Sequence, residues 1–294
     1  MRARPRPIAG RRVWLIGASS GIGAALAREL RRRGARLAVT ARRADQLDEV
    51  AGRDMAVVPA DVTDRRAVLA AARVVEDALG GVDTVVWCAG FWKRLDAADW
   101  DADAFARHVE VNLLGLNNVL AATLPGLVRR GDGHLVGVAS VAGYRGLPGS
   151  EAYGATKAAQ LNLFEALRAA LRGRGIRVTT VSPGFVRTPM TAANTFPMPF
   201  MIEADAAARA VADGLERGRT EIVFPLPVAL GMRLARLLPS RLWTALASRG
   251  SRAGGPRAGG APAGGTPAGG APAGGTPAGG TRTGERRPDR GSER

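Results

Sequence analysis

Two side chains in this sequence are spaced for proton transfer. Tyr153 and Lys157 lie four residues apart in the run Tyr-Gly-Ala-Thr-Lys, and positions i and i+4 share one face of a helix. A free tyrosine has a pKa near ~10, but an adjacent ammonium stabilises its phenolate and suits it to exchange a proton with a substrate oxygen. The same spacing arises by chance in surface helices, so the pair by itself identifies only a candidate acid/base centre.

A glycine-rich turn near the N-terminus predicts a phosphate-binding site. The apolar run 13–16 predicts a buried strand, and Ile22, Leu26 and Leu30 have the spacing of one helix stripe. A strand, a glycine-rich turn and a helix together present backbone N–H groups and a positive helix end to a phosphate. A signal peptide is rejected because glycines interrupt the apolar stretch and a charged helix follows it. The predicted cofactor contacts here are Gly17, Ser19, Ser20, Gly21, Ile22 and Gly23.

Arg42 and Arg43 follow a second predicted strand, 37–40. In NAD-binding units an acidic residue about 20 residues beyond the glycines often binds the ribose 2′-OH. Two guanidiniums suit a 2′-phosphate instead, so the sequence predicts NADP(H) in preference to NAD(H). The alternative is that both arginines cap a helix or face solvent, where charges contribute little.

With these motifs, the chain resembles the short-chain dehydrogenase/reductase family over about residues 10 to 225. The resemblance depends on seven motifs that occur in the family's order. They are Gly17-x-x-x-Gly21-x-Gly23, Asp61-Val62-Thr63, Cys88-Ala89-Gly90, Asn112, Ser140, Tyr153-x-x-x-Lys157 and Pro183-Gly184.

The resemblance implies a role for four catalytic residues. Ser140 would bond the substrate oxygen, and Tyr153 would be the acid/base. Lys157 would lower the pKa of Tyr153 and bond the nicotinamide ribose, while Asn112 would hold a water that links Lys157 to solvent. Taken singly, Ser140 could simply end a strand, and Asn112 could satisfy a backbone kink.

The resemblance also extends the predicted cofactor site beyond the glycine-rich turn and the two arginines. Asp61 would bond the adenine amino group, although an aspartate at a strand end is often only a turn or cap residue. The remaining implied contacts are Val62, Ala89, Gly90, Tyr153, Lys157, Pro183, Gly184, Val186 and Thr188.

Apolar strands alternate with helical segments along the chain, which predicts an α/β fold. The expected architecture is a single doubly wound, Rossmann-type parallel sheet with helices on both faces. Parallel strands end at one crevice, which would collect the motifs in one place. The predicted strands are 13–16, 37–40, 55–59, 84–87, 134–139, 176–181 and 221–224.

The ends of the chain differ in composition from the predicted domain, 11–248. Residues 1–10 form a basic arm, and 249–294 contain a Pro/Gly/Ala repeat that predicts a disordered tail. The net charge of +16 is partly concentrated in these ends, so nucleic-acid binding is not predicted. Within the domain, 222–248 form an amphipathic segment. We expect it to pack on a partner subunit or the substrate pocket, with peripheral membrane contact possible but not favoured.

Cysteine and histidine usage gives no sign of a metal site. Cys88 is the only cysteine, so no internal disulfide is possible and a cytoplasmic location is expected. His108 and His134 lack neighbours at metal-ligand spacing, which favours surface or cap positions.

The substrate is predicted only as a class. The loop 188–201 is rich in Pro, Phe and Met and corresponds to the family's substrate lid, which suggests an apolar carbonyl compound or alcohol. Trp92, Tyr144 and Met198 would contact it together with Ser140. The sequence therefore predicts an NADP(H)-dependent oxidoreductase that interconverts a ketone or aldehyde and an alcohol, as a homodimer or homotetramer. The alternative is a non-catalytic nucleotide-sensing or membrane-docking module on the same fold.

Overall fold

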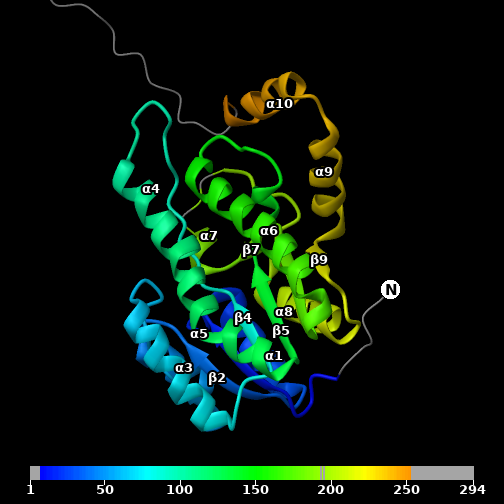
Figure 1. Ribbon diagram of the computed structural model, residues 1–294. Coiled ribbons are helices and arrows are strands. Elements are labelled where there is room, and N and C mark those ends of the chain that lie inside the picture. Colours follow the sequence, from blue (N-terminus) through cyan, green and yellow to red (C-terminus); the bar gives the residue numbers. More distant parts are fainter. Residues whose placement is uncertain (1–6, 193, 195, 253–294) are drawn as a thin grey trace, which may run out of the picture. The chain divides into compact units, whose positions relative to one another are not determined.

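The computed structural model describes residues 7–192, 194 and 196–252 (Figure 1). Most of the predicted basic arm (1–6) and of the predicted tail (253–294) lies outside the described residues. The last helix, α10 (Ser240–Arg252), extends a few residues into the segment that the sequence assigned to the tail.

A seven-stranded parallel sheet forms the centre of the domain, as predicted. Its strand order is β3-β2-β1-β4-β5-β6-β9, and every neighbouring pair is parallel. The buried strands are continuous apolar runs, as expected for a sheet covered on both faces. The strands are β1 (Arg12–Ile16), β2 (Arg36–Thr40), β3 (Met55–Val57), β4 (Thr84–Trp87), β5 (Gly133–Val138), β6 (Ile176–Pro183) and β9 (Glu221–Phe224).

Helices cover the two faces of this sheet and create two separate cores. Alternate residues of β1 point to opposite faces, so Val13 and Leu15 belong to one core and Trp14 and Ile16 to the other. The first core is closed by α1 (Gly21–Arg32), α2 (Ala44–Ala51) and α8 (Ala204–Glu216). The second is closed by α3 (Arg65–Leu79), α5 (Gly115–Arg130) and α6 (Glu151–Leu171).

The strand order reverses at β1, which lies between β2 and β4. At such a switch point the loops that follow neighbouring strands diverge and leave a crevice at the carboxyl ends of the strands. Gly17 follows β1 and Gly90 follows β4 in this crevice, while Ser140 follows β5 and Pro183 ends β6. The fold therefore brings motifs far apart in the sequence to one edge of the sheet.

One long helical stretch, 102–130, contains a π-helical turn. It comprises α4 (Ala102–Val109), η1 (Glu110–Leu114) and α5, and Asn112 lies in η1. Among the described residues this is the one helix long and apolar enough to cross a membrane by length and composition. Leu116, Val119 and Leu127 on it are buried in the second core, which identifies it as a core helix of the domain.

Short elements complete the domain around the carboxyl ends of the strands. Two of them, β7 and β8, pair as a separate parallel ribbon that frames the loop 188–201. Their bounds are η2 (Val141–Gly143), η3 (Arg172–Arg174), β7 (Val186–Arg187), α7 (Pro189–Ala192), β8 (Ile202–Glu203) and α9 (Leu226–Leu237).

Candidate active site

The glycine-rich turn between β1 and α1 is shaped by close backbone approaches. Gly17 has φ of +91°, a backbone conformation that residues with a side chain rarely adopt. A Cβ on Gly17 would lie 2.4 Å from the Ala89 nitrogen, and a Cβ on Gly23 would lie 2.0 Å from the Gly17 carbonyl oxygen. Ser20 is the N-cap of α1, yet its side chain makes no capping hydrogen bond. The turn thus leaves the N-terminal N–H groups of α1 accessible to bind an anion.

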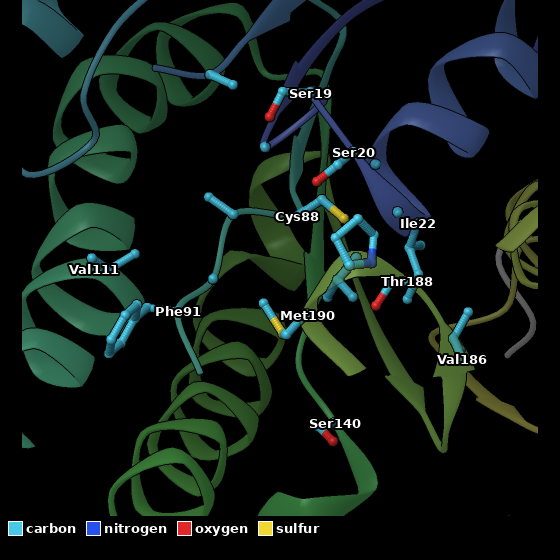
Figure 2. Close-up of a pocket in the computed structure, with 18 of the residues that line it drawn as sticks. Ser19, Ser20, Ile22, Cys88, Phe91, Val111, Ser140, Val186, Thr188 and Met190 are labelled. Atoms are coloured by element: carbon cyan, nitrogen blue, oxygen red, sulfur yellow. The ribbon is translucent and has the colours of Figure 1, made fainter. Parts of the chain in front are cut away.

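A single cleft runs from this turn along the carboxyl ends of the strands (Figure 2). Figure 2 shows Ser19, Ser20 and Ile22 around the glycine-rich turn, with Cys88 next to Ser20 and Ser140 toward the opposite end of the cleft. Every residue predicted to contact the cofactor lines this cleft. These residues are Gly17, Ser19, Ser20, Gly21, Ile22, Gly23, Arg42, Arg43, Asp61, Val62, Ala89, Gly90, Tyr153, Lys157, Pro183, Gly184, Val186 and Thr188.

Arg42 and Arg43 follow β2 and line the end of the cleft next to that strand. Arg43 donates from Nη2 to Ser19 Oγ at 3.3 Å, and Arg42 Nη1 lies 4.0 Å from Asp61 Oδ2. Asp61 accepts from the backbone nitrogen and hydroxyl of Thr63, both at 2.9 Å. Burial raises the pKa of Asp61, but the bonds from Thr63 and the nearby arginine charges together outweigh it, so the pKa is lowered. Two cations and one ionised carboxylate therefore surround this end of the cleft.

The three residues of the predicted acid/base centre meet at the opposite end of the cleft. Ser140 is buried at the end of β5, and Tyr153 and Lys157 share one face of α6. The Ser140 hydroxyl is hydrogen-bonded to Tyr153 and lowers the pKa of the phenol. Lys157 Nζ lies 5.5 Å from the centroid of the Tyr153 ring. The sequence prediction that these three side chains form one cluster therefore agrees with the geometry.

Asn112 does not line the cleft but supports it from behind. Its side chain exchanges two hydrogen bonds with the Phe91 backbone, accepting at 2.7 Å and donating at 3.1 Å. It also donates to Thr156 Oγ1 at 3.0 Å. The π-helical turn frees the Asn112 carbonyl from regular helix bonding, and Gln160 Nε2 donates to it at 2.7 Å. Asn112 thus ties the loop after β4 to α6.

Lys157 is held by partners that the sequence did not predict. Its Nζ donates to the Val138 carbonyl at 2.9 Å and to Gln160 Oε1 at 3.0 Å. The Gln160 amide thereby bridges Lys157 and the Asn112 carbonyl. Gln160 lies three residues after Lys157 on the same helix face, and this i+3 spacing is the signal that could have identified it.

Burial controls the proton affinities of the acid/base pair. It raises the pKa of Tyr153 to about 12, against the opposing effect of Ser140. It lowers the pKa of Lys157 to about 8. The predicted effect of Lys157 on the pKa of Tyr153 stays a prediction, because burial dominates in this state of the protein and the ammonium is directed to Val138 and Gln160. At neutral pH the site therefore holds a protonated phenol and a charged lysine.

Trp92 and Met198, which were predicted to contact substrate, lie outside the cleft lining, and Trp92 packs against the Tyr153 ring. The Trp92 ring stands edge-on to Tyr153, with 5.2 Å between centroids. Asn194 joins the two predicted residues, because it accepts from Trp92 Nε1 at 3.0 Å and donates to Met198 Sδ at 3.6 Å. Tyr144 instead packs under the Arg236 guanidinium, 5.3 Å away. Trp92 thus lies beside the phenol and is linked to Met198 through Asn194, and Tyr144 is not part of this chain of contacts.

Several residues that line the cleft were not predicted. Most are small or apolar and carry no motif, so only the backbone path reveals them. Cys88 is one of them, and burial raises the pKa of its thiol to about 11, which makes it a neutral apolar side chain. The unpredicted lining residues are Ala41, Ala60, Cys88, Phe91, Val111, Val138, Ala139, Pro189, Met190 and Thr191.

Both histidines are buried, so the prediction of surface or cap positions is wrong. His108 packs edge-on against Phe91, with ring centroids 4.8 Å apart, and accepts from the Lys93 nitrogen at 3.2 Å. His134 lies in β5 and contacts Thr179 Oγ1 at 2.8 Å. In the described part of the chain no cluster of three or more His, Cys, Asp or Glu could hold a metal ion.

The fold and the cleft together define a dinucleotide-binding oxidoreductase domain, and comparison with known proteins assigns its family. A family model described as short chain dehydrogenase matches residues 11–197. The chain therefore belongs to the short-chain dehydrogenase/reductase family and is an oxidoreductase.

Individual relatives agree with this assignment. An uncharacterized oxidoreductase of Myxococcus xanthus (strain DK1622) is 41% identical over 245 residues, which cover 81% of this chain and 97% of the relative. A short chain dehydrogenase from Burkholderia cenocepacia J2315, solved in complex with NADP, has 29% identity and a TM-score of 0.71 over 83% of this chain and 98% of its own. A Burkholderia phymatum enzyme solved with NAD shares the fold at 22% identity and a TM-score of 0.72, covering 79% and 95%. These similarities support a nicotinamide cofactor for this chain.

Proposed function

We propose that this protein is an NADP(H)-dependent oxidoreductase that interconverts a ketone or aldehyde and an alcohol, with Tyr153 as the acid/base. The observation that carries the proposal is the meeting of Ser140, Tyr153 and Lys157 in the same cleft as the glycine-rich turn. A screen of carbonyl compounds and alcohols, followed by NADPH absorbance, tests it. A chain that binds NADPH but turns over no compound of either class would instead favour the non-catalytic nucleotide-sensing alternative.

The residues of the cleft are suited to the cofactor. The backbone cradle at Gly17 and Gly23 has no space for side chains, and the free N-terminus of α1 suits a pyrophosphate. Gly90 lines the same cleft. When bound, NADPH supplies the hydride. Asp61 and Val62 would hold its adenine, and Pro183, Gly184, Val186 and Thr188 its nicotinamide end.

The side chains then supply the proton and the charge balance. Ser140 holds the carbonyl oxygen, and the neutral Tyr153 phenol donates a proton to it as the carbon receives hydride. The Lys157 ammonium stabilises the phenolate that remains. The alcohol leaves, and Tyr153 regains its proton from solvent. The reverse reaction uses the same groups in the opposite order.

Arg42 and Arg43 support the NADP(H) preference, and their loss should change it measurably. We expect the Arg42→Ala/Arg43→Ala double variant to bind NADPH roughly 10²- to 10⁴-fold more weakly, since each of the two lost charge-assisted hydrogen bonds contributes about 1.5–3 kcal/mol. NADH binding should change far less, because NADH has no 2′-phosphate. The dissociation constants for the two cofactors, measured by fluorescence titration, check this.

The matched control removes two arginines elsewhere. Arg172 and Arg174 are exposed in η3, outside the cleft lining, so their double alanine variant has the same loss of charge. It should leave the ratio of NADPH to NADH affinity unchanged. Equal losses of both cofactors in the Arg42/Arg43 variant would contradict a 2′-phosphate contact.

The same proposal covers the substrate and the setting of the enzyme. The Trp92 ring beside Tyr153 supports an apolar small-molecule carbonyl or alcohol, since an apolar wall does not compensate a polar substrate group. We propose a homodimer or homotetramer in the cytoplasm, in keeping with the single cysteine. Light scattering of the purified chain measures the subunit number.

A further inference from the structure

Helix α9 has its large apolar side chains on the outside. Leu226, Leu230, Leu234 and Leu237 are 78%, 62%, 56% and 81% exposed, whereas the small side chains Ala229 and Ala235 are buried. At 100° per residue the four leucines fall on one stripe. A helix that served only the core of this domain would have the opposite arrangement. The stripe therefore requires another partner.

Helix α10 continues this apolar surface, and contacts with the domain hold both helices in place. Leu242 and Leu246 on α10 are 55% and 52% exposed. Trp243 Nε1 donates to the Gly146 carbonyl at 2.8 Å, and Arg145 donates to the Leu238 carbonyl. These bonds prevent the helices from rolling their leucines inward. The leucine surface is defined as Leu226, Leu230, Leu234, Leu237, Leu242 and Leu246.

Helices α9 and α10 carry arginines and no acidic residue. The nearest acidic partner is Glu221 of β9, whose Oε2 lies 3.3 Å from Arg233 Nη2. Arg233, Arg236 and Arg241 lie on the same two helices as the leucines. In a twofold interface the same patch meets itself, which would place arginines against arginines at a cost. An anionic surface has the complementary charge.

We propose that the leucine surface docks the protein on an anionic lipid bilayer. The leucines would enter the boundary between headgroups and acyl chains, and the arginines would face the anionic headgroups. The contact is peripheral, because α9 has only 12 residues and a spanning helix needs about 20. Arginines near such a surface add an electrostatic attraction to the bilayer, which salt weakens.

Vesicle co-sedimentation of the full chain tests the docking. Vesicles of phosphatidylcholine with phosphatidylglycerol should bind the protein, and pure phosphatidylcholine vesicles or high salt should reduce binding. The Leu230→Gln/Leu234→Gln variant should bind anionic vesicles at least roughly tenfold more weakly, because both substitutions remove apolar surface that the bilayer would bury. Glutamine leaves the net charge unchanged, so the variant isolates the apolar contribution.

The control places the same changes on another exposed helix face. Leu69 and Val74 are exposed on α3, and their double glutamine variant should bind vesicles as the parent does. All three proteins should have the same turnover of a water-soluble substrate. Unchanged vesicle binding by the Leu230/Leu234 variant would overturn the proposal. Failure of the parent protein to bind anionic vesicles would overturn it as well. A dimer that dissociates only in that variant would assign the surface to a second copy instead.

A second inference concerns Gln160, and it depends on the proposed function. Gln160 is fully buried, and both ends of its amide are used, one by Lys157 Nζ at 3.0 Å and the other by the Asn112 carbonyl at 2.7 Å. We propose that Gln160 is a positioning residue that fixes the Lys157 ammonium for proton transfer at Tyr153. An ammonium has three donors. Val138 and Gln160 take two, which leaves one for the reaction.

The pH dependence of turnover separates positioning from a structural role. Burial lowers the pKa of Lys157 to about 8, so turnover should fall as pH rises through this region. Gln160→Leu removes the acceptor and should move this alkaline limb to lower pH, with turnover reduced about tenfold. Gln160→Glu supplies a charged acceptor and should move the limb to higher pH. A role in packing alone predicts no movement in opposite directions.

The outcomes distinguish this inference from the proposed function. A parent protein that reduces no carbonyl compound would refute the function, whatever Gln160 does. An active parent whose alkaline limb is the same in both variants would refute only the role of Gln160. Thermal melting of each variant shows whether a loss of turnover reflects unfolding. If a variant is unfolded, Gln160→Asn takes its place in the pH measurement. The shorter amide cannot span both partners and should move the limb to lower pH.

Discussion

Tyr153→Phe should lower turnover of any accepted substrate by about 10²- to 10⁴-fold, the contribution of a positioned general acid or base. The change removes one hydroxyl from a ring that packs edge-on against Trp92, so the fold should be kept. Tyr153 is protonated at neutral pH because burial raises its pKa to about 12. The variant therefore loses the proton donor while NADPH binding remains largely intact. Steady-state kinetics and NADPH titration measure the two effects.

The chain offers a matched control for this variant, because Tyr144 is its only other tyrosine. The Tyr144 ring packs under Arg236, outside the cleft lining. Tyr144→Phe should therefore reduce turnover far less than Tyr153→Phe. Full activity of the Tyr153 variant, or equal losses in the two variants, would disprove the assignment of Tyr153 as acid/base.

Lys157→Met should also reduce turnover by about 100-fold or more, because the phenolate formed during reduction loses its neighbouring cation. Lys93, the only other lysine, is exposed and paired with Asp101 at 2.8 Å. Lys93→Met removes the same group from the surface and should retain turnover. Kinetics of the two variants at pH 7 provide the comparison, and similar losses in both would argue against a specific role of Lys157.

The lysine variant also has a characteristic stability profile. The pKa of Lys157 is lowered from 10.5 to about 8 in the folded protein, so between these values the unfolded chain binds more protons than the folded one. The free energy of unfolding therefore contains a contribution that rises with pH across this window. Relative to Lys157→Met, the parent should gain stability from about pH 8 to pH 10.5. Denaturant melts across this range measure the difference, which should be absent for Lys93→Met.

Much of the fold and the cofactor cleft was determined by the sequence itself. Strand and helix periods are local properties, so runs such as 13–16 and the Ile22-Leu26-Leu30 stripe identified the elements and their order. The order of alternating elements fixes a parallel sheet, and a parallel sheet collects the residues that follow its strands. Gly17, Gly90, Ser140 and Pro183 were therefore predicted to meet, and they do.

Only the tertiary structure decided how the groups in the site act. Burial is a property of packing between distant segments, so no local pattern shows that the pKa of Tyr153 rises and that of Lys157 falls. Gln160 reaches Asn112 only because the π-helical turn presents its carbonyl to α6. Packing between distant segments also buries His108 and His134, which the local sequence did not indicate. The exposure of the α9 leucines could be recognised only from the tertiary structure, which shows which face of this helix packs against the domain.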